Sequence, residues 1–145
     1  MATTIYQPDT ALRSRYSSYV WRRTVLVVHD EDATIALFVD VICNEGYCVD
    51  VARDRQATME YLTTRTPGLV LVDLATLRPG GFQIVEELRR RFPGRELPIV
   101  LIAADDRLAV EAARLDVHLV HPPLAPSDIR RLTNKWSRAD AGEWQ

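Results

Sequence analysis

The chain has 145 residues, of which 47% are hydrophobic and 26% are charged, and its formal net charge is -2 at pH 7. This size and composition are those of one globular domain with a sizeable core. The slightly acidic balance argues against nucleic-acid binding, and no apolar stretch is long enough to predict a membrane span. Cys43 and Cys48 form neither a disulfide framework nor a metal motif. Free thiols are typical of a reducing compartment, so we expect a cytoplasmic protein.

The first 23 residues do not follow the pattern of the rest of the chain. They lack the apolar core of a secretory signal, and they place four aromatic residues among four arginines. We expect residues 1–23 to form a flexible arm, because chain termini are poorly ordered unless they are tied down. An arm that binds a partner or a second copy, giving a homodimer, is the alternative, because aromatic and arginine side chains favour interfaces.

From Thr24 onward, short apolar runs alternate with amphipathic stretches. The expected strands are 25–28, 47–52, 69–72, 99–103 and 117–120. They are rich in Val, Leu and Ile with little polar alternation, which is typical of parallel strands covered on both faces. The expected helices lie around 35–42, 57–62, 84–92, 108–115 and 129–136. Asp32 and Asp54 are the predicted N-caps of the first two helices, and Gly46 is the predicted stop of the first.

Five strands alternating with five helices predict an α/β fold with a doubly wound parallel sheet. The domain is expected to cover residues 24–137, with residues 138–145 as a C-terminal tail. Such sheets bind ligands at the carboxyl ends of their strands, near a topological switch point. The residues at the strand ends therefore carry most of the functional information.

Two carboxylates are expected at neighbouring strand ends. Asp73 closes the third apolar run, where a buried carboxylate is costly unless it is hydrated, paired or metal-bound. Asp30 follows the first apolar run, beside which the third is expected to lie. Two carboxylates in one cleft repel each other unless a cation intervenes, and Mg²⁺ is a hard ion that takes oxygen ligands. A carboxylate in this position could attack a phosphoryl group.

Four segments, VLVVHDE, LVLVDLATLRPGGF, PIVLIAA and HLVHPP, follow one another along residues 24–136. In this order they resemble the landmark segments of response-regulator receiver domains. The resemblance implies a flavodoxin-like sheet of strand order 2-1-3-4-5. It also implies a single-domain, non-enzymatic signalling protein of a two-component system or phosphorelay. Asp73 would be the phosphoacceptor, and Asp30, Asp73 and the backbone carbonyl of Ala75 would bind Mg²⁺. A histidine kinase or phosphotransfer protein would be the partner.

Four of the positions at which the chain departs from the receiver pattern bear directly on the site and its switch. The first of the two acidic residues that usually follow the first strand is His29. Ala103 replaces the Thr or Ser that ends the fourth strand, and His121 replaces the Lys that pairs with the acceptor. The switch aromatic of the fifth strand falls on His118. We therefore expect an atypical receiver that signals through protein contacts, with phosphorylation of Asp73 weakly linked to a conformational switch.

Two other functions remain open. One is a pseudo-receiver that works without phosphorylation. The other is a transition-metal or pH-sensing module, because imidazole and carboxylate ligands suit Zn²⁺ and imidazoles can titrate near neutrality. The candidate ligands of such a module are His29, Asp30, Asp73 and His121. A nucleotide carrier is disfavoured, because the acidic loop after the first strand has no glycine to cradle phosphate.

Overall fold

The structure is a computed structural model, and it describes residues 3–6, 23–74, 81–94 and 96–137. Its strands are β1 (Thr3–Tyr6), β2 (Thr24–Val28), β3 (Cys48–Ala52), β4 (Leu69–Asp73), β5 (Ile99–Ile102) and β6 (His118–Val120). Its helices are α3 (Asp32–Asn44), α4 (Arg55–Leu62), α5 (Gly81–Arg91), the 3-10 turn η1 (Asp106–Leu108), α6 (Ala109–Arg114) and α7 (Pro126–Trp136). None of the helices described is long and apolar enough to cross a membrane.

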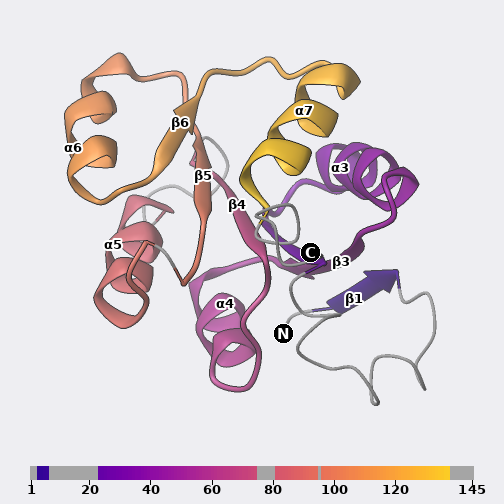
Figure 1. The fold of residues 1–145 in the computed structure, drawn as a ribbon, viewed down its shortest axis with the longest axis horizontal. Helices are drawn as coiled ribbons and strands as arrows, with labels where there is room; N and C mark the ends of the chain where they lie inside the picture. Colours follow the sequence, from indigo (N-terminus) through magenta and orange to yellow (C-terminus); the bar gives the residue numbers. More distant parts are fainter. Residues whose placement is uncertain (1–2, 7–22, 75–80, 95, 138–145) are drawn as a thin grey trace, which may run out of the picture.

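The sheet has six strands in the order β1-β3-β2-β4-β5-β6. Strands β2 to β6 are parallel, and their spatial order is the predicted 2-1-3-4-5, so the doubly wound fold is confirmed. The sequence did not lead us to expect β1, which comes from the arm and runs antiparallel to β3 (Figure 1). β-Branched and aromatic residues make up Thr3–Tyr6 and favour a strand. The rest of the arm, 7–22, and the tail, 138–145, lie outside the described residues.

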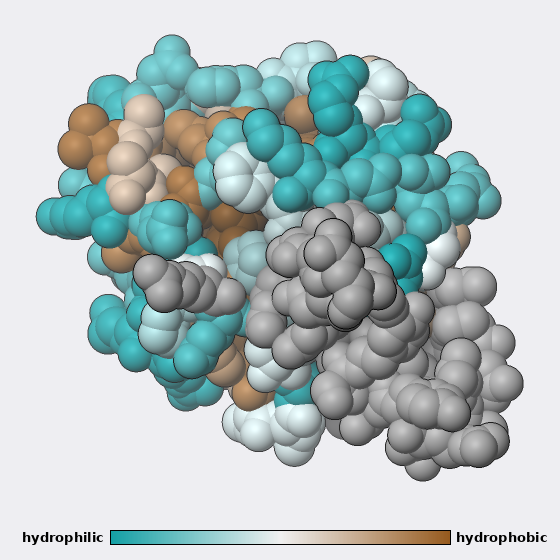
Figure 2. All heavy atoms as spheres, viewed as in Figure 1, coloured by the Kyte–Doolittle hydropathy of each residue, from teal (hydrophilic) through white to brown (hydrophobic). Residues whose placement is uncertain are grey.

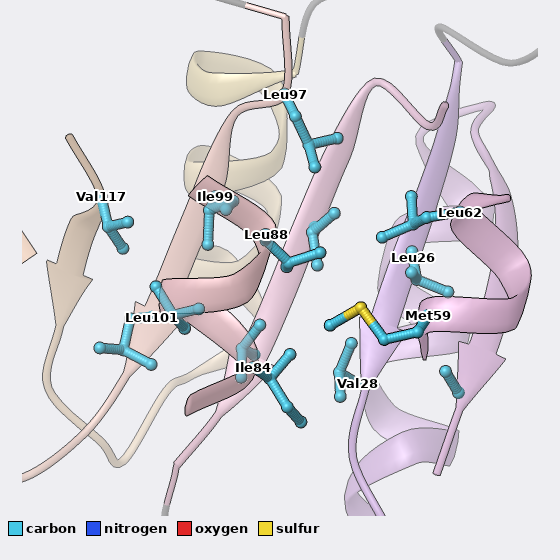
Figure 3. Packing of buried hydrophobic residues seen from close by; sticks show 14 of the residues in the cluster. Leu26, Val28, Met59, Leu62, Ile84, Leu88, Leu97, Ile99, Leu101 and Val117 are labelled. Carbon is cyan, nitrogen blue, oxygen red and sulfur yellow. The ribbon is translucent and has the colours of Figure 1, made fainter. Parts of the chain in front are cut away.

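The helices cover the two faces of this sheet (Figure 1). Successive strand residues point to opposite faces. On β2, Val25 and Val27 pack with α3 and α7, whereas Leu26 and Val28 pack with α4 and α5. Figure 3 shows this second cluster, in which Leu88 of α5 lies over the sheet. The central strands are therefore buried on both faces, as their apolar runs predicted.

The helix starts follow the predicted caps with one correction. The carboxylate of Asp54 caps α4 by accepting the backbone N–H of Ala57 at 2.7 Å. Helix α3 begins at Asp32 itself, so the N-cap is Glu31, whose side chain makes no capping hydrogen bond. Asp32 is the first helical residue, because the extended backbone conformation that defines an N-cap belongs to Glu31; the Asp32 carboxylate instead lies 2.6 Å from Nη2 of Arg53. The predicted short fourth helix is present as η1 followed by α6.

Arg89 of α5 connects the segments that lead into β5 and β6. Its guanidinium donates to the carbonyls of Leu115 at 2.7 Å and Asp116 at 2.8 Å, which precede β6. It also donates to the carbonyls of Phe92 at 3.4 Å and Leu97 at 2.6 Å, which precede β5. Burial lowers the pKa of this guanidinium, and the Asp116 carboxylate opposes that shift. One side chain thus fixes the approach to two strands.

Candidate functional site

The carboxyl ends of β2 and β4 lie side by side. The two strands pair in parallel as far as Val28 opposite Val72, so His29 and Asp73 come next at the same edge. Neighbours of β2 on its two sides are β3 and β4, which makes this edge the switch point of the sheet. The side chain of His29 is 1% exposed and that of Asp73 is 14% exposed. An imidazole and a carboxylate therefore meet at the floor of the predicted ligand site.

Two contacts fix the ring of His29. Its Nε2 lies 3.0 Å from Oδ2 of Asp73, and its Nδ1 accepts the backbone N–H of Glu31 at 3.1 Å. Because Nδ1 acts as an acceptor, the ring proton belongs on Nε2, on the side that faces Asp73. The Asp73 carboxylate therefore lies against a buried imidazole at the position where the receiver pattern has an acid. The sequence indicated the position of His29 but not this contact.

Asp30 lies on the exposed side of the same edge. Its backbone carbonyl accepts a hydrogen bond from Nη1 of Arg53 at 3.3 Å. Arg53 also forms the ion pair with Asp32, so a guanidinium that the sequence analysis did not single out stands beside this acidic loop. Within the described ranges, no three His, Cys, Asp or Glu side chains are grouped so that they could hold a metal.

The predicted metal ligands are thus brought together only in part. Asp30 and Asp73 share one edge, and their carboxylates are the hard oxygen donors that Mg²⁺ takes, usually together with several waters. Ala75 lies outside the described residues. His29 offers nitrogen, which Mg²⁺ disfavours relative to oxygen. The donor chemistry therefore fits Mg²⁺, with one carboxylate fewer than the receiver pattern supplies.

The carboxyl ends of β5 and β6 differ from the receiver pattern. Ala103 is 3% exposed, its backbone N–H donates to the carbonyl of Val120 at 3.0 Å, and its methyl group cannot bind phosphate. Nε2 of His121 contacts Oδ1 of Asp106 in η1, and these two side chains are 51% and 88% exposed. The partner of His121 is therefore Asp106 and not Asp73. The four proposed zinc ligands are not assembled in this part of the structure.

A hollow of about 350 Å³ lies beside β6 and α7. On one wall the ring of His118 stacks on that of Trp136, with centroids 4.3 Å apart, and Nζ of Lys135 lies 5.2 Å from the same indole. Burial, and then the charge of Lys135, lower the pKa of His118 and favour its neutral form. The other lining residues are Val120, His121, Pro123, Leu124, Asp128, Arg131 and Leu132. The sequence analysis identified His118 but did not predict a hollow.

Hydrophobic side chains gather on the surface over α6 and β6, whereas the surface over α3 and α7 is mainly hydrophilic (Figure 2). Val110 of α6 is 76% exposed, and its neighbours Ala109 and Ala113 are also exposed. Exposed apolar surface next to a hollow is a feature of sites that contact other molecules.

A doubly wound parallel sheet with an aspartate at the end of a central strand is the architecture of phosphate-accepting signalling domains, as the segment resemblance predicted. Comparison with known families agrees: the response regulator receiver domain matches residues 25–134. The chain therefore belongs to the response-regulator receiver domain family, whose members serve in two-component signalling.

Several relatives resemble this chain over the same region. The transcriptional regulatory protein DltR of Streptococcus agalactiae is 29% identical over 93 residues, which are 64% of this chain and 41% of DltR. The Regulator of RpoS from Escherichia coli is 29% identical over 111 residues, which are 76% of this chain and 32% of that protein. This chain thus spans less than half the length of these relatives.

Solved receiver structures share the fold. The receiver domain of NtrX from Brucella abortus has a TM-score of 0.67 and 25% identity, and the match covers 82% of this chain and 99% of that one. A CheY-like receiver domain protein from Methanospirillum hungatei has a TM-score of 0.69 at 18% identity, covering 81% of this chain and 96% of that one. The predicted family and fold are both confirmed.

Proposed function

We propose that this chain is an atypical receiver in which Asp73 accepts a phosphoryl group while the β5–β6 side responds weakly. The observation that carries this proposal is that the carboxylate at the end of β4 is present, whereas residues around it differ from the receiver pattern. His29 contacts Asp73, and Ala103 lies one residue beyond Ile102, the β5 partner of Asp73. A histidine kinase or phosphotransfer protein supplies the phosphoryl group, and the output is a protein contact.

The chemistry begins at the Asp73 carboxylate. One of its oxygens attacks phosphorus of a phosphohistidine or acyl phosphate, and the new P–O bond forms as the donor's P–N or P–O bond breaks. Mg²⁺, when held by Asp30 and Asp73, supplies positive charge that offsets the negative charge of the phosphoryl oxygens. Nε2 of His29 lies 3.0 Å from Oδ2 of Asp73, and the buried imidazole positions the carboxylate through that contact.

Two features support weak coupling to the β5–β6 side. A hydroxyl at position 103 would form a hydrogen bond to a charged phosphoryl group, a contact that contributes about 1.5–3 kcal/mol. Allosteric couplings are about 1–3 kcal/mol, so the methyl group of Ala103 removes a contribution as large as a whole coupling. His121, where the receiver pattern has Lys, binds Asp106 instead. Both routes by which β5 and β6 would sense a phosphoryl group are therefore changed.

The contact surface that we propose is the region of α6, β6 and α7. It combines the exposed Val110 with the hollow beside Trp136. A partner that reads this surface in its resting form would make phosphorylation dispensable, which is the pseudo-receiver alternative. The altered Ala103 and His121 positions are the observations that favour that alternative.

The test is treatment of the full chain with acetyl phosphate and Mg²⁺, followed by intact-mass measurement and by fluorescence of Trp136 with Trp21 and Trp144 replaced by Phe. We expect one added phosphoryl group in wild type, none in Asp73→Asn, and little change in the emission of Trp136. The matched control is Asp40→Asn, which changes an exposed carboxylate of α3 and should be modified like wild type.

Each of three other outcomes would contradict a different part of the proposal. An unmodified wild-type chain would exclude the receiver proposal and leave the phosphorylation-independent pseudo-receiver. Modification that persists in Asp73→Asn would assign the acceptor to another residue. A large change in Trp136 emission that depends on Asp73 would show strong coupling and contradict the atypical behaviour proposed here.

A further inference from the structure

The hollow beside β6 and α7 has the size of a small-molecule site. Its volume is about 350 Å³, and pockets that hold small ligands measure about 300–1,000 Å³. Its apolar lining comes from the end of β6, the loop that follows it and α7, and consists of Val120, Leu124 and Leu132. Leu132 also packs in the core between α7 and the sheet, with 7% of its surface exposed. The hollow can therefore bury the apolar part of a ligand against side chains that the fold holds in place.

Two aromatic rings form a wall of this hollow. The ring of His118 stacks on that of Trp136 at an interplanar angle of 29°, with centroids 4.3 Å apart. One ring comes from β6 and the other from α7 (Figure 1), so the packing of helix on sheet fixes the pair before any ligand arrives. Burial, and then the charge of Lys135, lower the pKa of His118 and favour its neutral form. A wall of this kind can pack against a flat apolar ring.

The charged groups of the lining leave one cation without an acid. Asp128 is the one carboxylate among the described lining residues. Its Oδ2 accepts the backbone N–H of Ala125 at 2.8 Å, and its Oδ1 lies 3.5 Å from Nη1 of Arg131. Nζ of Lys135 lies 5.2 Å from the centre of the Trp136 ring, and within the described ranges no carboxylate forms an ion pair with it. A positive charge therefore stands beside the aromatic wall.

We propose that this hollow binds a small aromatic carboxylate, with its ring against His118 and Trp136 and its negative charge at Lys135. The one ammonium left over after Arg131 has paired with Asp128 favours a ligand with a single negative charge over a nucleotide, whose several charges need more donors. The apolar lining favours a ring over an inorganic anion. The inference goes beyond the proposed function, because it holds whether or not Asp73 is phosphorylated.

The site is tested by calorimetric titration of the full chain with naphthoate, for which we expect one molecule bound per chain. Naphthamide keeps the rings without the charge, and acetate keeps the charge without the rings, so each should bind at least about tenfold more weakly. Lys135→Met should weaken naphthoate binding by about tenfold or more, because an interaction with a charged group is lost. The matched control is Arg114→Met, which removes an exposed cation of α6 outside the hollow and should bind like wild type.

A second measurement locates the ligand without any substitution. Lys135 is the only lysine of the chain. Reductive methylation with isotopically labelled formaldehyde therefore places NMR-visible methyl groups on Lys135 and on the amino terminus alone, and it preserves the charge. Naphthoate should shift the signal of Lys135 more than that of the amino terminus.

Four results would overturn the proposal. The first is a wild-type chain that does not bind naphthoate at millimolar concentration. The second is equal binding of naphthamide, because the ammonium would then play no part. The third is naphthoate binding that Lys135→Met leaves unchanged, because the ligand would then lie elsewhere. The fourth is tighter binding of acetyl-tetraglutamate than of naphthoate, which would assign the hollow to an acidic protein segment.

Discussion

The carboxyl ends of the strands form two regions that differ in their side chains. The first half consists of the ends of β2 and β4, and the second half consists of the ends of β5 and β6. At the ends of β2 and β4, His29 and Asp73 are both largely buried and lie in contact. At the ends of β5 and β6, Ala103 presents a methyl group, and the half-exposed His121 contacts Asp106, which is more exposed still. The first half holds the carboxylate that we propose as the phosphoacceptor, and the second half has a methyl group and a histidine at the positions where the receiver pattern has a hydroxyl and a lysine.

Burial explains why the halves could diverge. A carboxylate near the floor of a site needs a polar partner whether or not it is phosphorylated, because an unpaired buried charge is costly. His29 lies against this carboxylate, so the pair supports the folded state whether or not Asp73 is phosphorylated. Exposed pairs such as His121 with Asp106 contribute little, about 0–1 kcal/mol. Folding therefore constrains the first half more strongly than the second.

The largest effect is expected from Arg89, which holds the amino ends of the two strands whose carboxyl ends form the second half. Arg89→Ala removes the side chain that satisfies four backbone carbonyls next to β5 and β6. We expect the free energy of unfolding in urea to fall by about 2–4 kcal/mol, because several carbonyls lose their donor at once. Arg90→Ala is the control, since Arg90 is exposed, and it should change stability by no more than about 0.5 kcal/mol. Equal effects of the two variants would contradict this role of Arg89.

The next largest effect is expected from a substitution that restores the missing hydroxyl at the end of β5. Ala103→Thr restores a hydroxyl beside the acceptor and should tighten binding of beryllofluoride by about 1.5–3 kcal/mol. It should also make the emission of Trp136 respond to beryllofluoride more strongly than we expect for wild type. Ala103→Val is the matched control, because it has the shape of threonine without the hydroxyl. If valine and threonine behave alike, the missing hydroxyl is not the cause of weak coupling.

The fold and this comparison were predictable from sequence to different degrees. The apolar runs predicted the parallel strands, because strands buried on both faces must be apolar along their length. The positions of Asp73, His29 and Ala103 followed from where those runs end. The short strand Thr3–Tyr6 was missed because its partner is distant in sequence, although four consecutive β-favouring residues were a signal.

Side-chain partners were the part that sequence could not supply. His121 contacts Asp106 because η1 lies next to the end of β6 in the folded chain. No local sequence pattern predicts that these two segments meet. The stacking of His118 on Trp136 joins β6 to α7 across a connecting loop. Both contacts are set by tertiary packing and not by the spacing of residues along the chain.

A smaller effect is expected from restoring the receiver pattern at the end of β2. His29→Asp restores a second acid beside Asp73 and should raise the affinity for Mg²⁺ about tenfold, which corresponds to about 1.4 kcal/mol. Without metal the same variant should be less stable than wild type, because two buried carboxylates then repel each other. Calorimetric titration and metal-dependent melting measure both effects. His29→Asn, which adds no charge, should bind Mg²⁺ no more tightly than wild type, and a gain there would assign the effect to lost imidazole.

The smallest effect concerns acid sensitivity in the second half. Burial and then the charge of Lys135 lower the pKa of His118 in the folded chain, so on acidification the unfolded chain binds the proton first. The contribution of His118 to stability is therefore complete above its unfolded pKa of about 6.5 and decreases as the pH falls through that value toward the lower folded pKa. The other charged or titratable groups around the hollow are His121, Asp128 and Arg131.

His118→Phe keeps a ring against Trp136 but does not titrate, so its free energy of unfolding in urea should decline less than that of wild type between about pH 7 and 5. If His118→Phe declines as steeply as wild type, the acid sensitivity arises outside β6, and the second half does not differ from the first in this respect.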